Sequence, residues 1–317
     1  MFDVVVIGSG PAGYVAAIRA SQLGLKTLCI EELSNDKGKP NFGGTCLNVG
    51  CIPSKSLLDS SHRYYEAKKN LSDHGIQLGD VKLDLKTMME RKDNIVSKLT
   101  GGIDGLFLTN KVESICGKGK VISKNTVQID KADGSSEKVD AKNIIIATGS
   151  SPIEIPAASF GKHIVDSTGA LAFDSVPKRL GVVGAGIIGL ELGSVWSRLG
   201  SEVTVIEALE DFLPMTDTDI SKESLKEFKK QGLDIQLASK VTSTKELKNL
   251  VKVKYEQKGK EIEVEFDKLI VAVGRKPNSD KVLPKNLSIK IENGFIHVNE
   301  YCQTSVENIW AVGDVVR

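Results

Sequence analysis

The sequence lacks the features that would place it in several specialised classes of protein. Among its 317 residues, no apolar run approaches the roughly 20 residues that a membrane-spanning helix needs. The net charge is only +1, which gives no electrostatic reason to expect nucleic acid or a membrane surface as a partner. Hydrophobic residues at 40% and charged residues at 26% are typical of a globular protein with room for two domains.

The N-terminus also lacks a targeting signal. The apolar segment 2–7 begins directly after Met1, with no basic region and no cleavage site before it. We therefore expect a cytoplasmic protein of bacterial type. A mitochondrial matrix enzyme whose presequence has been removed would start in the same way.

Cysteine is scarce, and two of the five cysteines lie in one distinctive stretch, GGTCLNVGCIPSK at 43–55. Cys46 and Cys51 have no second cysteine or histidine cluster beside them, which disfavours a metal site. In a regular helix their Cα atoms would be about 8.7 Å apart, whereas a disulfide needs at most about 7 Å. If they bond, the backbone must leave regular helix, and Gly50 and Pro53 would allow this. A redox pair is favoured over a static disulfide or two buried thiols.

The first part of the chain contains a complete dinucleotide-binding pattern. An apolar strand at 2–7 runs into the glycine turn Gly8–Gly13. Residues 14–20 then begin a helix that ends near Gly24, and a second strand at 26–30 ends at Glu31. The glycines allow a tight turn and let backbone N–H groups approach a pyrophosphate, while the acid can accept hydrogen bonds from a ribose. Because strand, turn, helix and acid occur together, a nucleotide site is favoured over a simple tight turn.

The same pattern recurs in the second half. A strand at 180–183 precedes the turn Gly184–Gly189, a helix covers 190–199, and a strand at 202–206 ends at Glu207. The acid follows the first glycine by 23 residues in both copies. This internal repeat predicts two separate dinucleotide sites. An acid at 207 favours a free ribose 2′-hydroxyl, and hence NAD over NADP.

Further signals complete the predicted α/β fold. Helices are expected over 54–70 and 86–100, the second ended by Gly101-Gly102, and a hairpin turn at 133–134. Two apolar strands end in polar turns, Thr148-Gly149-Ser150 and Gly313-Asp314, where open α/β sheets bind ligands. The prediction is two Rossmann-like domains of the three-layer ββα type. Residues 1–150 with 277–317 would bind FAD, an assignment that rests on the family resemblance below, and 151–276 would bind the nicotinamide nucleotide.

With two glycine turns, a CxxxxC pair and a late Gly-Asp, the whole chain resembles the pyridine nucleotide–disulfide oxidoreductases. The block at 43–55 has the form typical of the dihydrolipoamide dehydrogenase branch. Glutathione reductases commonly carry a different residue before the final lysine and an arginine-rich NADP site, and neither is present. The resemblance implies FAD in the first site, NAD in the second, and oxidation of dihydrolipoamide to lipoamide through a Cys46–Cys51 redox disulfide.

The resemblance also implies roles for individual residues. Cys46 would meet the substrate, Cys51 would lie nearer the flavin, and Lys55 would lie near flavin N5 and pair with Glu191. FAD would contact Gly8, Gly10, Gly13, Glu31, Gly44, Thr45, Cys46, Lys55, Gly119, Thr148, Gly149, Ser150 and Asp314. NAD would contact Gly184, Gly186, Gly189, Glu207, Val241 and Gly274. For the Lys55–Glu191 pair, an ordinary solvated surface contact is the alternative.

The family's C-terminal interface domain, with its catalytic His and Glu, is not found before Arg317. None of the four histidines has the expected spacing to a glutamate. We therefore expect a truncated chain that is inactive alone, from an enzyme that is otherwise a homodimer acting on lipoyl domains of 2-oxo acid dehydrogenase complexes. A mercuric reductase, which shares the cysteine pair, and a non-catalytic FAD- and NAD-binding module remain alternatives.

Overall fold

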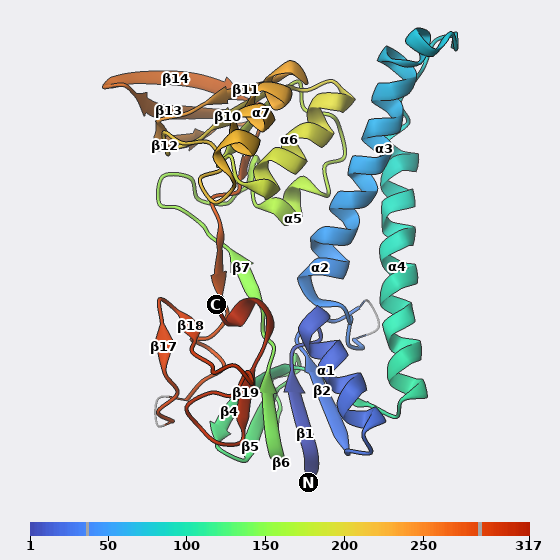
Figure 1. The fold of residues 1–317 in the computed structure, drawn as a ribbon, viewed down its shortest axis with the longest axis vertical. Coiled ribbons are helices and arrows are strands. Elements are labelled where there is room, and N and C mark those ends of the chain that lie inside the picture. Colours follow the sequence, from blue (N-terminus) through green and yellow to red (C-terminus); the bar gives the residue numbers. More distant parts are fainter. Residues whose placement is uncertain (36–37, 285–286) are drawn as a thin grey trace. The chain divides into compact units, whose positions relative to one another are not determined.

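The computed structural model describes residues 1–35, 38–284 and 287–317 and divides into two compact units (Figure 1). Unit 1 comprises Met1–Ile52, Ile95–Ser151 and Arg275–Arg317. Unit 2 comprises Pro53–Asn94 and Pro152–Gly274. The units are defined by packing alone, so the assignment of FAD and NAD domains stays a prediction.

Unit 1 is built on a mainly parallel sheet. Its elements are β1 (Phe2–Ile7), α1 (Pro11–Gln22), β2 (Thr27–Glu31), α2 (Gly44–Val49), β3 (Glu113–Cys116), β4 (Lys118–Ser123), β5 (Thr126–Asp130), β6 (Ser136–Ile146), β7 (Ser150–Pro152), β16 (Arg275–Pro277), β17 (Ile291–Glu292), β18 (Phe295–Ile296), β19 (Ile309–Ala311) and the 3₁₀ turn η2 (Gly313–Val315). The sheet order is β3-β2-β1-β6-β5-β4, with β19 also paired to β6. The strands β3, β2, β1, β6 and β19 pair in parallel, whereas β4, β5 and the first half of β6 pair antiparallel.

The two faces of β1 show why unit 1 has three layers. Val4 and Val6 pack on one face with Ala17 and Ala20 of α1. The alternate residues of β1 join a second core with side chains from β2, β4, β5 and β6. Because successive side chains of a strand point to opposite faces, both faces of an apolar parallel strand must be covered. The helix covers one and the antiparallel strands cover the other.

Unit 2 repeats this architecture. Its elements are η1 (Leu71–His74), β8 (Ile164–Val165), α5 (Ser167–Ala170), β9 (Arg179–Val183), α6 (Ile187–Leu199), β10 (Glu202–Ile206), α7 (Thr218–Lys230), β11 (Leu233–Gln236), β12 (Ser239–Glu246), β13 (Val251–Gln257), β14 (Lys260–Phe266) and β15 (Lys268–Val271). The parallel sheet has the order β11-β10-β9-β15-β8, and β12, β13 and β14 form an antiparallel sheet. One core joins the parallel sheet to α6 and another joins it to the antiparallel sheet. The predicted ββα arrangement is confirmed in both units.

Two long helices, α3 (Cys51–Lys69) and α4 (Leu85–Thr109), contribute residues to both units and run side by side (Figure 1). The prediction that Gly101-Gly102 ends the second helix is wrong. The helix continues to Thr109 because Ile103 and Phe107 are buried in the core of unit 1, where the Phe107 ring lies 4.6 Å from that of Phe42. Burial of these side chains outweighs the roughly 1 kcal/mol that each helical glycine costs.

The sequence predicted most strands of the two parallel sheets but missed several others. The strands β4, β11 and β12 and the short helix α2 were not expected, because each is short or has mixed polarity. Among the helices in residues 1–35, 38–284 and 287–317, none combines the length and apolar character needed to cross a bilayer.

Candidate redox and nucleotide-binding sites

Cys46 and Cys51 form a disulfide in unit 1, with Cα atoms 4.7 Å apart. The expected break in the helix is present: α2 ends at Val49, Gly50 has φ −140° and ψ −113°, and α3 begins at Cys51. Glycine is needed at position 50 because a Cβ there would lie 2.9 Å from the carbonyl oxygen of Thr45. The backbone break therefore brings together two residues that a regular helix would separate.

Three further cysteines carry free thiols and differ in their surroundings. Cys29 is fully buried in the sheet, and burial, followed by the charge of Glu31, raises the pKa of its thiol. Cys116 is only partly buried, and burial, followed by the charge of Glu31, also raises the pKa of its thiol. Because thiolates are the reactive form, these two thiols are poor nucleophiles. Cys302 is exposed.

The glycine turn after β1 is tight because the backbone contacts itself. Gly8 has φ +101°, and a Cβ there would lie 2.3 Å from the carbonyl oxygen of Ala147, the residue directly after β6. A Cβ on Gly13 would lie 1.9 Å from the carbonyl oxygen of Gly8. Both positions therefore exclude any side chain for reasons internal to the protein.

Gly10 is different, since the protein itself leaves space there. It caps α1 with an ordinary φ of −64°, and a Cβ at this position would have Cα of Gly44 as its nearest neighbour, at 3.9 Å. Gly44 has φ +57° and can have no Cβ, because that atom would lie 2.6 Å from Cα of Gly10. The N–H of Gly43 donates to the carbonyl oxygen of Ser9 over 3.0 Å. The segment that begins the redox stretch thus lies directly against the first glycine turn.

Glu31, at the end of β2, is 5% exposed and holds this turn in shape. One carboxylate oxygen accepts hydrogen bonds from the N–H (3.0 Å) and the hydroxyl of Ser9, and the other accepts from the N–H of Leu33 (2.8 Å). Each oxygen can accept more than one hydrogen bond. The predicted ribose contact is therefore compatible with these internal bonds.

The turn after β9 has the same construction. Gly184 has φ +102°, and its Cβ would lie 2.6 Å from the carbonyl oxygen of Ala272. A Cβ on Gly189 would lie 2.2 Å from the carbonyl oxygen of Gly184. Gly186 caps α6 with φ −74°, and no atom lies within 4 Å of its Cβ position. The side chain of Ile187 beside it is 69% exposed, so this turn is open to solvent within unit 2.

The carboxylate of Glu207 follows the pattern of its counterpart in unit 1. It accepts hydrogen bonds from the N–H groups of Ala185 (2.7 Å) and Leu209 (2.9 Å). Val241 lies in β12 with its side chain in the core between the two sheets, so only its backbone could meet a nucleotide. Gly274 has φ +131°, and its carbonyl oxygen accepts a hydrogen bond from the N–H of Ile153.

The ends of β6 and β19 lie together in unit 1. Two residues that contact this region, Arg275 and Asn278, were not predicted as site residues from the sequence. Ser150 donates its hydroxyl proton to Asp314 over 2.8 Å and accepts a hydrogen bond from Arg275. Asn278 exchanges hydrogen bonds with both backbone and side chain of Thr148 and accepts one from Ser151. The signal in the sequence was the polar segment Gly274–Asn278, which follows a strand. The sequence alone does not show which residues this segment contacts.

Packing within unit 1 is sufficient to explain why position 119 is a glycine. It lies in β4, and a Cβ there would be 2.8 Å from Cγ2 of Ile7. The carboxyl end of β1 is therefore covered by a glycine of the antiparallel layer. A contact between Gly119 and FAD stays a prediction.

Lys55 and Glu191 form the ion pair that the resemblance suggested. Nζ of Lys55 lies 2.5 Å from a carboxylate oxygen of Glu191, both within unit 2, with 59% and 26% of the side chains exposed. A pair this exposed contributes on the order of 0.2–1 kcal/mol to stability. Its value would lie in fixing the position of the lysine, which stands four residues after Cys51 in α3.

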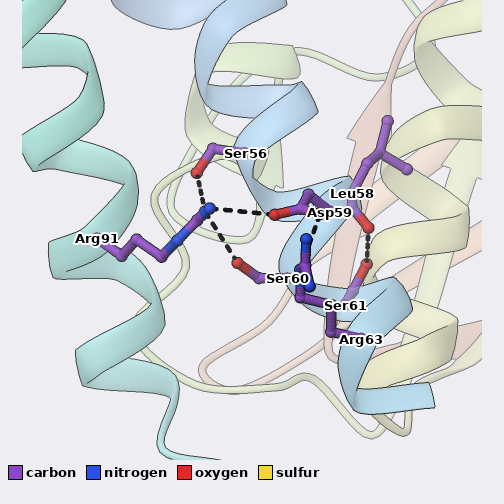
Figure 2. Close-up of polar contacts among 7 residues, drawn as sticks. All are labelled: Ser56, Leu58, Asp59, Ser60, Ser61, Arg63 and Arg91. Atoms are coloured by element: carbon purple, nitrogen blue, oxygen red, sulfur yellow. Dashed lines mark hydrogen bonds and ion pairs between the residues drawn. The ribbon is translucent and has the colours of Figure 1, made fainter. Parts of the chain in front are cut away.

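A second set of contacts fixes the same stretch of α3. Figure 2 shows the guanidinium of Arg91, from α4, among Ser56, Asp59 and Ser60 of α3. It donates to the two hydroxyls over 3.1 and 3.2 Å and to the carboxylate over 3.0 Å. The other carboxylate oxygen of Asp59 accepts from Arg63. These bonds join α3 and α4 next to Lys55.

The two glycine turns fit the groups that the fold implies. At Gly10 and Gly186 the backbone is unstrained and no packing atom excludes a side chain, so the protein itself gives no reason for glycine. Close approach of a pyrophosphate to the helix N-terminus is such a reason. In the part of the chain that the structure describes, no cluster of His, Cys, Asp and Glu could hold a metal ion.

Comparison with known proteins finds relatives that align with the full length of this chain. A family model described as pyridine nucleotide-disulphide oxidoreductase matches residues 2–317. The chain is 50% identical to the dihydrolipoyl dehydrogenase of Cupriavidus necator over 100% of this chain and 68% of that protein. It is 48% identical to the leghemoglobin reductase of Vigna unguiculata and 47% identical to the mitochondrial dihydrolipoyl dehydrogenase of Bos taurus, covering 60% and 62% of those proteins and 99% of this chain.

A solved structure shows the same fold. The HOCl-induced flavoprotein disulfide reductase RclA from Escherichia coli superposes with a TM-score of 0.83 at 29% identity, covering 99% of this chain and 66% of that one. The chain thus spans 60 to 68% of the length of these relatives.

Proposed function

The chain belongs to the pyridine nucleotide-disulphide oxidoreductase family, and from that premise we propose that the protein containing this chain oxidises dihydrolipoamide to lipoamide and reduces NAD⁺. The observation that carries this proposal is the Cys46–Cys51 disulfide at a broken helix, in a chain 50% identical to a dihydrolipoyl dehydrogenase. The glycine turn of unit 1 would hold FAD and that of unit 2 would hold NAD.

The residues that would hold FAD surround the first turn. The N–H groups at the start of α1 would bind the pyrophosphate, since Gly10 leaves space there, and Glu31 would accept from the ribose. Gly44, Thr45 and Cys46 are the next candidates, because Gly44 contacts Gly10. When bound, FAD supplies a two-electron carrier between the cysteine pair and NAD⁺.

NAD would bind the second turn in the same way. Gly186 leaves the N-terminus of α6 open, and Glu207 would accept from a ribose with a free 2′-hydroxyl. Val241 and Gly274 would contribute backbone contacts. A phosphate at the 2′ position would meet the negative charge of Glu207, which is why NAD is preferred over NADP.

The cysteines would act by thiol–disulfide exchange. A substrate thiolate attacks Sγ of Cys46, the bond between the two cysteines breaks, and Cys51 leaves as a thiolate. The second substrate thiol gives its proton to solvent and attacks the substrate sulfur of the mixed disulfide, lipoamide closes, and the Cys46 thiolate is released. Cys51 is the first residue of the 19-residue helix α3, whose N-terminus stabilises a thiolate. Because a more stable thiolate leaves faster, attack at Cys46 is favoured.

The partners follow from the reaction. The dithiol would be presented by lipoyl domains of 2-oxo acid dehydrogenase complexes, and the full protein would be a homodimer. Its compartment would be the bacterial cytoplasm, since a relative 50% identical to this chain comes from Cupriavidus necator. Each of these statements rests on the proposed reaction.

The test is the cysteine pair itself. Anaerobic NADH should reduce the FAD-loaded protein and expose two new titratable thiols, whereas Cys51→Ser should yield none and Cys302→Ser, which alters an exposed free thiol, should behave as the parent. Equal thiol yields in Cys51→Ser and the parent would contradict the proposal and favour a non-catalytic binding module. Turnover of Hg²⁺ but not lipoamide by the full protein would favour a mercuric reductase.

A further inference from the structure

Two N–H groups of Arg275 bind a single residue, Ser150, which is the first residue of β7. Nε donates to the hydroxyl oxygen of Ser150 over 2.8 Å, and Nη2 donates to the carbonyl oxygen of Ser150 over 2.5 Å. The hydroxyl of Ser150 in turn donates to a carboxylate oxygen of Asp314 over 2.8 Å. Ser150 is buried, and it connects the half-buried Arg275 to the exposed Asp314.

The direction of this chain is fixed by its first member. A guanidinium has only donors, so the Ser150 oxygen that faces Arg275 must accept. A serine hydroxyl has one proton, and with its oxygen accepting from Arg275 that proton is available for Asp314. The carboxylate is then held through one oxygen, Oδ2, while no bond to Oδ1 is formed by Ser150.

We propose that Arg275 is a positioning residue that acts through the Ser150 hydroxyl to hold the Asp314 carboxylate toward a hydroxyl of FAD. The inference rests on the proposed function for the identity of the ligand. It also changes the role expected of Ser150: its hydroxyl proton goes to Asp314, and it acts on the cofactor through that carboxylate instead of binding it directly.

A purely structural role for Arg275 makes a different prediction. Arg275 begins β16, and Ser150 begins β7, with which β16 pairs. If Arg275 only fastens these strands, its bond to the Ser150 carbonyl is what matters. Ser150→Ala keeps that carbonyl and removes only the hydroxyl, so it separates the two roles.

The experiment measures the FAD dissociation constant of the apoprotein by quenching of flavin fluorescence. Arg275→Met and Ser150→Ala should each raise it about tenfold, the scale of one hydrogen bond to a charged group. The double variant should also show about tenfold and not their product, because both changes break one chain of bonds. Ser150→Thr, which retains a hydroxyl, should bind FAD as the parent does.

Two controls make the outcome decisive. Lys276→Met removes a neighbouring exposed positive charge and should leave FAD binding unchanged. In an Asp314→Ala background, Ser150→Ala should add nothing. The proposed relay from Arg275 through Ser150 to Asp314 is overturned if Ser150→Ala binds FAD like the parent. It is also overturned if the effect of Ser150→Ala persists in full without Asp314. If Arg275→Met fails to fold, the Ser150 variants still decide.

The same experiment distinguishes the relay from the proposed function. A parent protein that binds no FAD overturns both. A parent that binds FAD, together with an unaffected Ser150→Ala, overturns the relay alone. A parent whose FAD binding depends on Ser150, but whose cysteine pair is not reduced by NADH, supports the relay and contradicts the proposed reaction.

Discussion

The glycine turns of the two units have the same internal hydrogen bonds but differ in what surrounds them. In unit 1, Glu31 accepts from the N–H of the residue after the first glycine and from that of Leu33. In unit 2, Glu207 accepts from the two equivalent N–H groups. The acid therefore holds the turn in shape in both copies, independently of any contact with a ribose. A terminal acid in such a pattern has a structural role as well as the recognition role usually given to it.

The surroundings separate the copies. In unit 1 the Gly43-Gly44 segment packs on the turn and bonds to it. In unit 2 no atom lies within 4 Å of the Cβ position of Gly186, and Ile187 is exposed. A turn covered by its own chain suits a ligand that stays bound, and an open turn suits one that exchanges. This difference agrees with the proposal that FAD stays bound at the first turn and that NAD exchanges at the second.

The largest predicted effect tests whether the two turns are equally strained. Gly13→Ala and Gly189→Ala would each place a methyl group within 2.2 Å of a carbonyl oxygen. Each should lower the free energy of unfolding by about 3 kcal/mol, the upper range for overpacking. Denaturant unfolding of the apoprotein measures this.

Gly105→Ala, in α4 with no neighbour near its Cβ position, is the matched control. It should raise stability by up to about 1 kcal/mol. A similar loss in all three variants would show that alanine is tolerated no better in open helix than in the turns, and would contradict the steric explanation.

The second prediction separates binding from folding. Gly10→Ala should weaken FAD binding and Gly186→Ala should weaken NADH binding, each by at least about tenfold, because a methyl group would occupy the space beside the pyrophosphate. The free energy of unfolding should change by about 1 kcal/mol or less, since the protein leaves room at both sites. Titration of each nucleotide checks this, and cross-effects on the other nucleotide would contradict two separate sites.

The third prediction concerns the acids, and it tests the smallest effect, a difference of about 1 kcal/mol between their two costs. Glu31→Gln should destabilise the apoprotein by about 2 kcal/mol and Glu207→Gln by about 1 kcal/mol, because the buried Glu31 also accepts from the Ser9 hydroxyl. Ser9→Ala in unit 1, which makes the turn resemble Ala185 in unit 2, should bring the two costs together. Equal costs in the parent background would mean that the extra hydroxyl contributes nothing.

The sequence predicted the repeated units because their signals are local. Glycine turns, apolar strands and a terminal acid lie within about 30 residues of each other, as in any βαβ unit. The broken helix at Gly50 was also predicted, because cysteine spacing and helix geometry decide it.

The rest depended on contacts that are distant in the chain. The continuation of α4 through Gly101 and Gly102 is decided by burial of Phe107 against Phe42, which propensity does not reveal. The bonds of Arg275 and Asn278 join residues more than 100 positions apart, and a polar run alone does not identify such partners. The hydrogen bonds of Ser150 to Arg275 and Asp314 are equally distant in the chain, and a direct contact of Ser150 with FAD stays a prediction.

The break at Gly50 has a consequence for how the cysteine pair behaves once it is opened. The two Cα atoms are held 4.7 Å apart at a sequence separation of five, by helices on both sides. If a small thiol such as glutathione opens the bond, it forms a mixed disulfide with one cysteine and leaves the other as a thiolate. That thiolate would face the mixed disulfide at a local concentration far above that of dissolved thiols. Its attack re-forms the bond between Cys46 and Cys51 and expels the small thiol, which would protect the redox pair in a thiol-rich environment.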